Sequence, residues 1–144
     1  MVAVESLKNT DLFQDISDQA LETIAGFGEL VEFEEGDSLY QLGDDANDLY
    51  FLESGRMRFS IGVGDRLDGA GSLILSGRIF GWAALLHDKP RRVAAASCLE
   101  DSTVYVIPRN KLLELFDQDH VAGYQVMRRL ATTIAGDFVS VFSV

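Results

Sequence analysis

The chain has 144 residues, of which 47% are hydrophobic, and its formal net charge is −11. This length favours a single domain with a sizeable core, and the acidic balance argues against direct binding to nucleic acid, which depends on Lys and Arg. No apolar run approaches the roughly 18 residues of a membrane span, and the first residues do not read as a signal peptide, so we expect a cytoplasmic protein that does not bind membranes. The single cysteine, Cys98, permits no internal disulfide or cysteine-based metal centre, and we expect it in the core.

The N-terminal segment, 1–28, is predicted to be helical. Ser17 is well placed to cap a helix, because its side-chain oxygen can accept a hydrogen bond from a backbone N–H of the first turn. An apolar stripe follows and ends at Gly26, and it consists of Leu21, Ile24 and Ala25. This pattern predicts a short helix that packs one face on the rest of the domain.

The middle segment, 29–108, has the pattern of short strands. Apolar residues alternate with polar ones, and glycine recurs every few residues; the apolar positions are Val31, Phe33, Leu39, Leu49, Phe51, Met57, Phe59, Ile61 and Val63. Further strands are expected at 72–75, 93–97 and 103–107. Many short strands separated by turns predict a mainly β domain, a small antiparallel β jelly roll, rather than an alternating α/β fold.

The C-terminal segment, 109–144, is predicted to form two helices, one around 111–116 and a longer one that starts near His120. In the longer helix five apolar residues are spaced 3, 4, 4 and 3 apart: Met127, Leu130, Ile134, Phe138 and Val141. Such a seam packs either on its own domain or on a partner helix, and periodicity does not separate the two. We expect Gly136 and Asp137 to interrupt the seam and the last turn to fray or extend.

The segment 77–95 concentrates positive charge in an acidic chain. Between positions 78 and 92 one acidic residue stands against four basic ones, Arg78, Lys89, Arg91 and Arg92. Gly81 precedes a short run of helix formers, and a helix start offers backbone N–H groups to an anion. An arginine can close over that anion from the other side. The segment therefore predicts an anion-binding cassette.

Several motifs, taken in their order along the chain, carry a resemblance to a known family. They are Phe33-Glu34-Glu35-Gly36-Asp37, Leu39-Tyr40-Gln41-Leu42-Gly43-Asp44, Asp48-Leu49-Tyr50-Phe51-Leu52-Glu53-Ser54-Gly55, Phe80-Gly81, Ala84-Leu85-Leu86, Pro90-Arg91-Arg92 and Leu99-Glu100-Asp101. Together they resemble the cyclic nucleotide-binding domain shared by catabolite-activator-type transcription regulators, kinase regulatory subunits and gated channels. The resemblance covers nearly the whole chain.

The resemblance implies an eight-stranded jelly roll with flanking helices, a phosphate-binding cassette, and a C-terminal helix that moves or dimerises. The phosphate-binding arginine falls on Arg92 when counted back from Leu99, and on Arg91 when counted from Pro90; we favour Arg92. The implied ligand-binding residues are Gly81, Trp82, Ala83, Ala84, Arg91, Arg92, Val93, Ala94 and Ala95.

The cassette departs from the family pattern at two polar positions. Trp82 stands where the family has a glutamate that accepts the ribose 2′-hydroxyl, and Ala95 stands where a serine or threonine binds the phosphate. Two lost contacts of this kind weaken binding by about 10²- to 10⁴-fold. The phosphate-binding cassette is therefore degenerate as a site for cAMP or cGMP, although it keeps its general anion-binding elements.

Two functions follow from this reading. The first is a regulatory module that senses a small anionic effector, a cyclic nucleotide or related phosphate, and signals through its C-terminal helix as a homodimer or to a partner regulatory protein. The second is a ligand-free interaction or dimerisation domain in which Trp82 fills the pocket. Enzyme motifs such as G-x-S-x-G, a P-loop or H-E-x-x-H are missing, and His87 and His120 are too few for a histidine-rich metal site. We therefore expect no catalysis and no metal.

Overall fold

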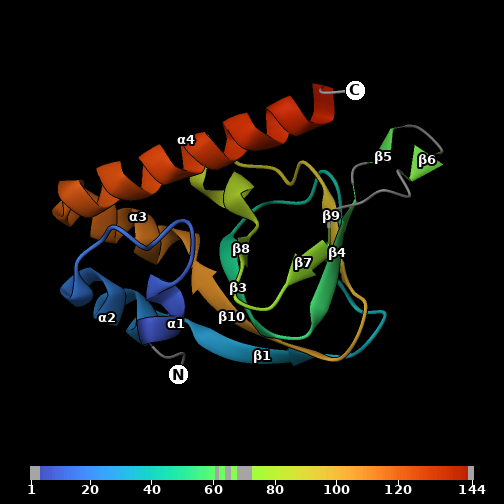
Figure 1. The fold of residues 1–144 in the computed structure, drawn as a ribbon, viewed down its shortest axis with the longest axis horizontal. Coiled ribbons are helices and arrows are strands. Elements are labelled where there is room, and N and C mark those ends of the chain that lie inside the picture. The colour runs from blue at the N-terminus through green and yellow to red at the C-terminus, as the bar shows by residue number, and fades with distance from the viewer. Residues whose placement is uncertain (1–3, 61, 64–65, 68–72, 143–144) are drawn as a thin grey trace.

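A computed structural model describes residues 4–60, 62–63, 66–67 and 73–142, with side chains for all of these except 62–63, 66–67 and 137–142. Helices flank a β domain at both ends of the chain (Figure 1). The elements, in chain order, are α1 (Val4–Lys8), α2 (Asp18–Phe27), β1 (Glu29–Phe33), β2 (Ser38–Tyr40), β3 (Asp48–Ser54), β4 (Arg56–Ser60), β5 (Gly62–Val63), β6 (Arg66–Leu67), β7 (Leu73–Leu75), β8 (Ile79–Phe80), the 3-10 helix η1 (Trp82–Leu85), β9 (Ala95–Cys98), β10 (Ser102–Pro108), α3 (Arg109–Gln118) and α4 (His120–Phe142).

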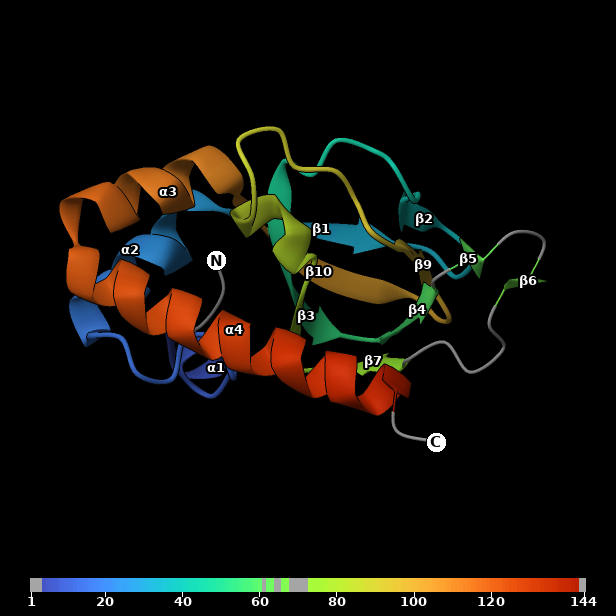
Figure 2. The ribbon, with the colours of Figure 1, turned by 90° about the horizontal axis from the view of Figure 1, so that it is seen from above.

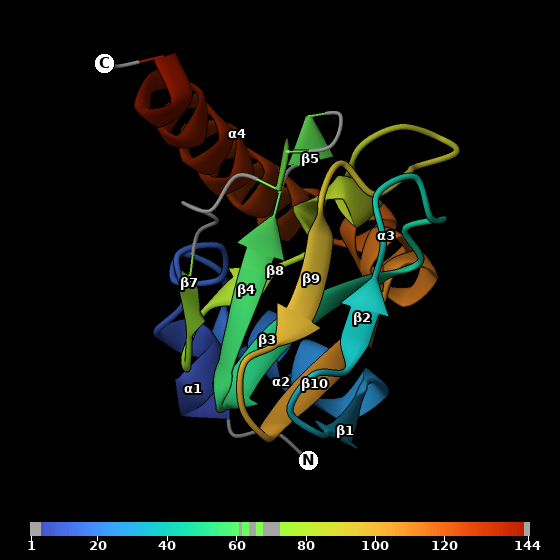
Figure 3. The same ribbon diagram turned by 90° about the vertical axis from the view of Figure 1, so that its right-hand side faces the viewer.

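Eight of the strands form two four-stranded antiparallel sheets, in the orders β1-β10-β3-β8 and β2-β9-β4-β7, and β5 pairs with β6 in a separate hairpin. The second sheet lies across the first, and Figure 3 shows β2, β9 and β4 side by side. Strand β10 is central to the first sheet, because it pairs with β1 on one side and β3 on the other. The predicted antiparallel jelly roll is confirmed.

The N-terminal helices cover one end of the first sheet. The Ser17 side chain accepts a hydrogen bond from the Ala20 N–H at 3.1 Å, which confirms the predicted cap of α2. Helix α2 is then tied to β10 by Tyr105, whose buried hydroxyl accepts from the Gly28 N–H at 2.8 Å and lies 2.7 Å from the Ala25 carbonyl oxygen. A Cβ at Gly28 would lie 2.7 Å from the Tyr105 ring, so this close approach requires glycine.

The apolar residues form two main clusters. The larger lies between the helices and the first sheet, and the predicted α2 stripe is buried in it. The second fills the space between the two sheets and includes the buried Cys98, which confirms its predicted place in the core. The two clusters meet along β3 and β10, whose successive side chains point to opposite faces of the sheet. This arrangement fixes the short segments between β8 and β9 against the β domain.

Two predictions about element boundaries need correction. Strand β9 begins at Ala95, two residues later than expected, because the Arg92 backbone pairs instead with the loop before β3: its N–H donates to the Asp44 carbonyl at 2.7 Å and its carbonyl accepts from Gly43 at 2.9 Å. Helix α4 runs without interruption through Gly136, since one glycine costs only about 1 kcal/mol in a long cooperative helix. Position 72, in the expected strand 72–75, lies outside the described residues.

Helix α4 crosses the molecule along its length, from α3 over η1 towards the end that carries β5 and β6 (Figures 1 and 2). Leu130 is 1% exposed within the domain's own core and Ile134 packs against that core, so this part of the predicted seam is intramolecular. Met127 is 37% exposed. The side chains of Phe138 and Val141 lie outside the described part of the protein.

The described residues include no helix that is long and apolar enough to cross a membrane. Within the same residues, no three His, Cys, Asp or Glu side chains are grouped so that they could hold a metal ion.

Candidate functional site

The predicted cassette folds as a tight turn followed by the single-turn helix η1. Gly81 stands at the helix start with a φ of 79°, in the left-handed region that favours glycine. A Cβ at this position would lie 2.8 Å from a ring carbon of Tyr50 and 2.9 Å from Nη1 of Arg92. Glycine is therefore required both by the backbone conformation and by the close approach of the two side chains beneath it.

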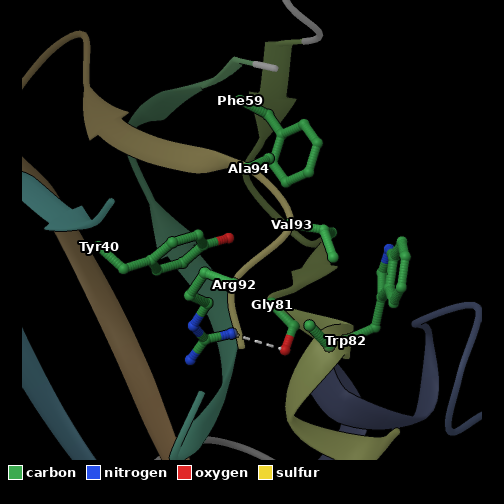
Figure 4. A pocket seen from close by; sticks show the side chains of 8 residues that line it. Tyr40, Phe59, Gly81, Trp82, Arg92, Val93 and Ala94 are labelled. Carbon is green, nitrogen blue, oxygen red and sulfur yellow. Dashed lines mark hydrogen bonds between the residues drawn. The ribbon is translucent and has the colours of Figure 1, made fainter. Parts of the chain in front are cut away.

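Arg92 is 3% exposed, and it is the only charged residue that is buried among those whose exposure the structure describes. Its Nη1 donates to the Gly81 carbonyl at 2.9 Å (Figure 4). Its Nη2 donates to the Asp48 carbonyl at 2.7 Å. Its guanidinium carbon lies 4.2 Å from the centre of the Tyr40 ring and 5.2 Å from that of Tyr50. The cation is thus held by two carbonyls and two aromatic faces.

The positive charge of Arg92 is not matched by a carboxylate. None of the ion pairs among the described residues involves it, and Asp48 offers its backbone carbonyl rather than its side chain. Burial raises the pKa of the Asp48 carboxyl, although the Arg92 charge opposes that rise. A buried cation without a counter-ion is costly, so this position favours an anion.

Arg92 lines a pocket between the β domain and η1. The pocket encloses ≈ 200 Å³ of empty space, part of it open to solvent, but the volume in which the centre of a water molecule fits is only ≈ 10 Å³. That is room for about one water. The lining residues are Tyr40, Phe59, Gly81, Trp82, Ala83, Arg92, Val93 and Ala94.

Two of the lining residues, Tyr40 and Phe59, are not among the predicted site residues. Tyr40 is buried and stacks on Tyr50, with ring centres 5.8 Å apart, and Tyr50 stacks on Phe80 at 5.2 Å. The strand pattern could have indicated an inward side chain for Phe59 but not for Tyr40, and only the fold brings β2 and β4 to the cassette. The aromatic stack fixes the ring against which Arg92 lies.

The two neighbouring arginines have opposite surroundings. Arg91 is exposed, forms an ion pair with Asp45 at 3.2 Å, and donates to the Gly43 carbonyl at 3.3 Å. It does not line the pocket, whereas Arg92 does. The structure therefore puts Arg92, and not Arg91, in the position to meet a ligand; the phosphate contact itself stays a prediction.

Some of the remaining predicted site residues line the pocket, and others do not. Trp82 lines the pocket, but Figure 4 shows its indole pointing away from Tyr40 and Arg92, and it packs against the larger apolar cluster. Ala83, Val93 and Ala94 line the pocket, whereas Ala84 packs with Ala46, and Ala95, the first residue of β9, does not line it. The space beside Arg92 is thus narrowed by Tyr40 rather than filled by the indole.

A second arginine, which sequence reasoning missed, holds the far end of the cassette. Arg109 begins α3, and its Nε donates to the Ala84 carbonyl at 2.7 Å while its Nη2 donates to the His87 carbonyl at 3.0 Å. His87 has a φ of 45°, a conformation that residues other than glycine rarely adopt. Because α3 packs against α4, Arg109 connects the cassette to the C-terminal helices.

Comparison with known proteins agrees with this geometry. Over 117 residues the chain is 27% identical to the anaerobic regulatory protein of Bacillus subtilis. The match covers 81% of this chain and 49% of that protein, so the chain spans about half the length of this relative. The sensor domain of the transcriptional regulator DNR from Pseudomonas aeruginosa has the same fold, with a TM-score of 0.75, 17% identity and coverage of 97% and 93% of the two chains. The regulatory domain of Toxoplasma gondii PKA, solved with cAMP, has a TM-score of 0.71, 22% identity and coverage of 78% and 42%.

The family is settled by a match to one family description. Residues 30–119, more than half of the chain, match the cyclic nucleotide-binding domain, and this range contains the whole cassette and both sheets except Glu29, the first residue of β1. The resemblance carried by the sequence motifs is therefore confirmed. The chain belongs to the cyclic nucleotide-binding domain family and is a regulatory domain of that kind.

Proposed function

We propose that the chain is a cytoplasmic sensor domain that binds a small anionic effector, a cyclic nucleotide or related phosphate, beside Arg92. The observation that carries the proposal is the buried guanidinium without a carboxylate partner in a pocket that reaches the surface. An anionic group there supplies the missing counter-charge, and in low dielectric a charge-assisted hydrogen bond is strong. The Toxoplasma relative solved with cAMP supports the choice of effector class. The role is binding, not catalysis.

The pocket is too narrow for a nucleotide in the conformation described. The ≈ 10 Å³ in which the centre of a water molecule fits is far below the roughly 300–1,000 Å³ of typical small-molecule sites. Binding of a nucleotide therefore requires Gly81 and η1, the first part of the cassette, to move outward, away from Tyr40 and Arg92. Such a coupling between occupancy and cassette position is what a sensor needs, because a ligand shifts a conformational equilibrium only when it binds the two states differently.

The signal then passes to the C-terminal helices through Arg109. Its guanidinium bonds to the carbonyls of Ala84 and His87 in the middle of the cassette, which ties the cassette to α3. Its backbone N–H donates to the Asn47 carbonyl at 2.9 Å, which fixes the start of α3 beside β3. We infer that an outward shift of the cassette displaces α3 and with it α4. The exposed Met127 and the outer turns of α4 then change what they offer to a second copy or a partner regulatory protein.

Ligand binding is tested by thermal unfolding and calorimetry with cAMP, cGMP and inorganic phosphate. A ligand at 100 times its Kd stabilises the native state by about 2.7 kcal/mol, which raises Tm by roughly 5–10 °C in a domain of this size. Arg92→Met keeps an unbranched apolar stem, removes the charge and its donors, and is expected to abolish the shift. Arg91→Met, which changes the exposed neighbour, is the matched control and is expected to preserve it. The proposal fails if the parent protein responds to none of the three compounds.

Signal transfer is tested separately with Arg109→Met. Hydrogen exchange of α4 amides is expected to change on ligand addition in the parent protein. In Arg109→Met the ligand still binds, because Arg92 is intact, but the change in α4 is expected to disappear. An unaltered α4 response in this variant would contradict the proposed route through α3.

A second candidate function is favoured by the size of the pocket. The space beside Arg92 holds about one water, and both Nη groups already have carbonyl acceptors. A ligand-free interaction domain on this scaffold would use the exposed apolar residues of α4, which are Val121, Tyr124 and Met127. Tyr124→Glu would then weaken self-association in sedimentation experiments, while the ligand panel gave no response.

A further inference from the structure

Two buried side-chain atoms in the described part of the chain have no hydrogen-bond partner in the protein: Tyr40 Oη and Arg92 Nε. Both residues line the same pocket, and they are 5% and 3% exposed. Buried hydroxyl and guanidinium groups are almost always hydrogen-bonded in folded proteins. Two such atoms, on two residues that line one pocket, therefore point to a ligand in that pocket.

The Tyr40 hydroxyl is held in a fixed position. Its ring contacts the Arg92 guanidinium, whose central carbon lies 4.2 Å from the ring centre, and it stacks on Tyr50, whose ring plane is inclined by 19°. Strand β2 anchors the residue from below, where Tyr40 pairs with Ala96 of β9. A group that is already oriented loses little entropy when it binds, so the hydroxyl is preorganised for a ligand.

The chemistry of the two unpartnered atoms is that of hydrogen-bond donors beside a positive charge. Each Nη of Arg92 donates one hydrogen bond, to the Gly81 carbonyl and the Asp48 carbonyl respectively, whereas the buried Nε–H has no acceptor. Burial raises the pKa of the Tyr40 hydroxyl, and the Arg92 charge opposes this only in part, so the phenol keeps its proton and can donate. Among the lining residues Tyr40 supplies the only hydroxyl.

We propose that Tyr40 is a specificity-determining residue, whose Oη–H, together with the Arg92 Nε–H, binds one oxygen of a compact oxyanion. The ligand class is a phosphate-like group, either free or as the phosphodiester of a cyclic nucleotide. This inference rests on the proposed function, since it assigns a second contact at the same site. It also explains why a phenol stands where phenylalanine would stack on Arg92 equally well without burying an unpaired oxygen.

Tyr40→Phe removes one oxygen and keeps the ring that stacks on Arg92. Tyr124→Phe is the matched control, because it makes the same change at a side chain that is 64% exposed on α4. Kd is measured by calorimetry for inorganic phosphate, cAMP and cGMP, at constant ionic strength set with sodium chloride, and Tm is measured without ligand. Binding of phosphate alone would identify the free oxyanion as the ligand, and binding of the nucleotides alone would identify the phosphodiester.

In Tyr40→Phe we expect Kd to rise about tenfold to a hundredfold, the loss of one hydrogen bond to a charged group. Without ligand its Tm is expected to equal or exceed that of the parent, because a buried unpaired hydroxyl is removed. An unchanged Kd would overturn the inference and would mean that the hydroxyl contacts only water. A raised Kd with a lowered Tm would also overturn it, since the role would then be structural.

The inference and the proposed function fail in different ways. If the parent protein binds and Tyr40→Phe binds equally well, while Arg92→Met does not bind, the sensor function stands and the role of Tyr40 is refuted. If the parent protein binds none of the three compounds, both are refuted together.

Discussion

The substitution Gly81→Ala adds a single methyl group at a crowded point of the site and so tests its geometry. Its φ of 79° is unfavourable for any residue with a Cβ, and the added carbon would lie 2.8 Å from Tyr50 and 2.9 Å from Arg92 Nη1. The left-handed conformation costs about 1–2 kcal/mol in alanine. Relief of the two overlaps requires side chains to shift, which costs a further 1–3 kcal/mol or so.

Gly77→Ala provides the matched control for Gly81→Ala. Gly77 has a φ of 90°, but nothing lies within 4 Å of the position its Cβ would take. It therefore incurs only the conformational cost, about 1–2 kcal/mol, whereas Gly81→Ala loses about 2–5 kcal/mol in total. At about 3 °C per kcal/mol, Tm is expected to fall by roughly 3–6 °C in the control and by roughly 6–15 °C in Gly81→Ala.

The assay combines thermal unfolding, followed by circular dichroism, with the ligand panel. The extra loss in Gly81→Ala comes from displacing Arg92, so the same variant is expected to lose its ligand response while Gly77→Ala keeps it. Equal losses of Tm in the two variants would refute the reasoning, because they would show that the Gly81 position is not crowded by Tyr50 and Arg92.

Two further predictions concern the N-terminal helices. Tyr105→Phe removes the hydroxyl that accepts from the Gly28 N–H at 2.8 Å, and a stranded buried donor is expected to cost about 1–3 kcal/mol of unfolding free energy in urea titrations; a loss below 0.5 kcal/mol or so would contradict it. Hydrogen bonds from Arg129 hold the pKa of the Asp15 carboxyl below its usual 3.8, so the pair stabilises the folded chain above pH 3.8 and loses that contribution as the pH falls through the lower native pKa. Urea midpoints of Asp15→Asn and the parent are expected to differ at neutral pH and to converge in acid, and a difference independent of pH would refute this.

The strand pattern and the order of motifs were enough to predict the jelly roll, because alternation and turn glycines are local properties. The choice of Arg92 over Arg91 depended on counting residues back from Leu99. Its physical reason is a contact between segments that are far apart in the sequence. Asp45 and Arg91 form an isolated antiparallel bridge, so the loop before β3 holds Arg91 at the surface. The next side chain along the chain then points inward, into the pocket.

Tyr40 escaped prediction for a related reason. Strict alternation would put Ser38 and Tyr40 on the same face of β2, yet Ser38 is exposed and Tyr40 is buried. The register between β2 and β9 shifts between these two residues, and such irregularities re-aim side chains. A sequence shows the period of a strand but not the position of an irregularity set by the partner strand, so a pocket-lining phenol was not visible in it.

The packing of the α4 seam was also not predictable from the sequence. Helical periodicity identifies an apolar face, but it does not say what covers that face. Leu130 is buried within its own domain, whereas Val121 and Tyr124, which the seam leaves out, are exposed. If α4 also contacts a second chain, the contact involves Val121 and Tyr124 rather than the seam, because Leu130 is already buried in the core of its own domain.

Two arginines hold the segments on either side of η1, and both also bind the backbone at the start of β3. Arg92 donates to the Gly81 carbonyl, just before η1, and to the carbonyl of Asp48, the first residue of β3. Arg109 donates to the His87 carbonyl, just after η1, and its backbone N–H donates to the carbonyl of Asn47, the neighbour of Asp48. In the proposed sensor, an anion that draws Arg92 away from its carbonyls would release Gly81 and the start of η1, while the residues after η1 stay tied to α3 by Arg109. We therefore predict that the movement falls on the turn at His87, whose φ is 45°, and that a change at Arg92 reaches α3 through this single short segment.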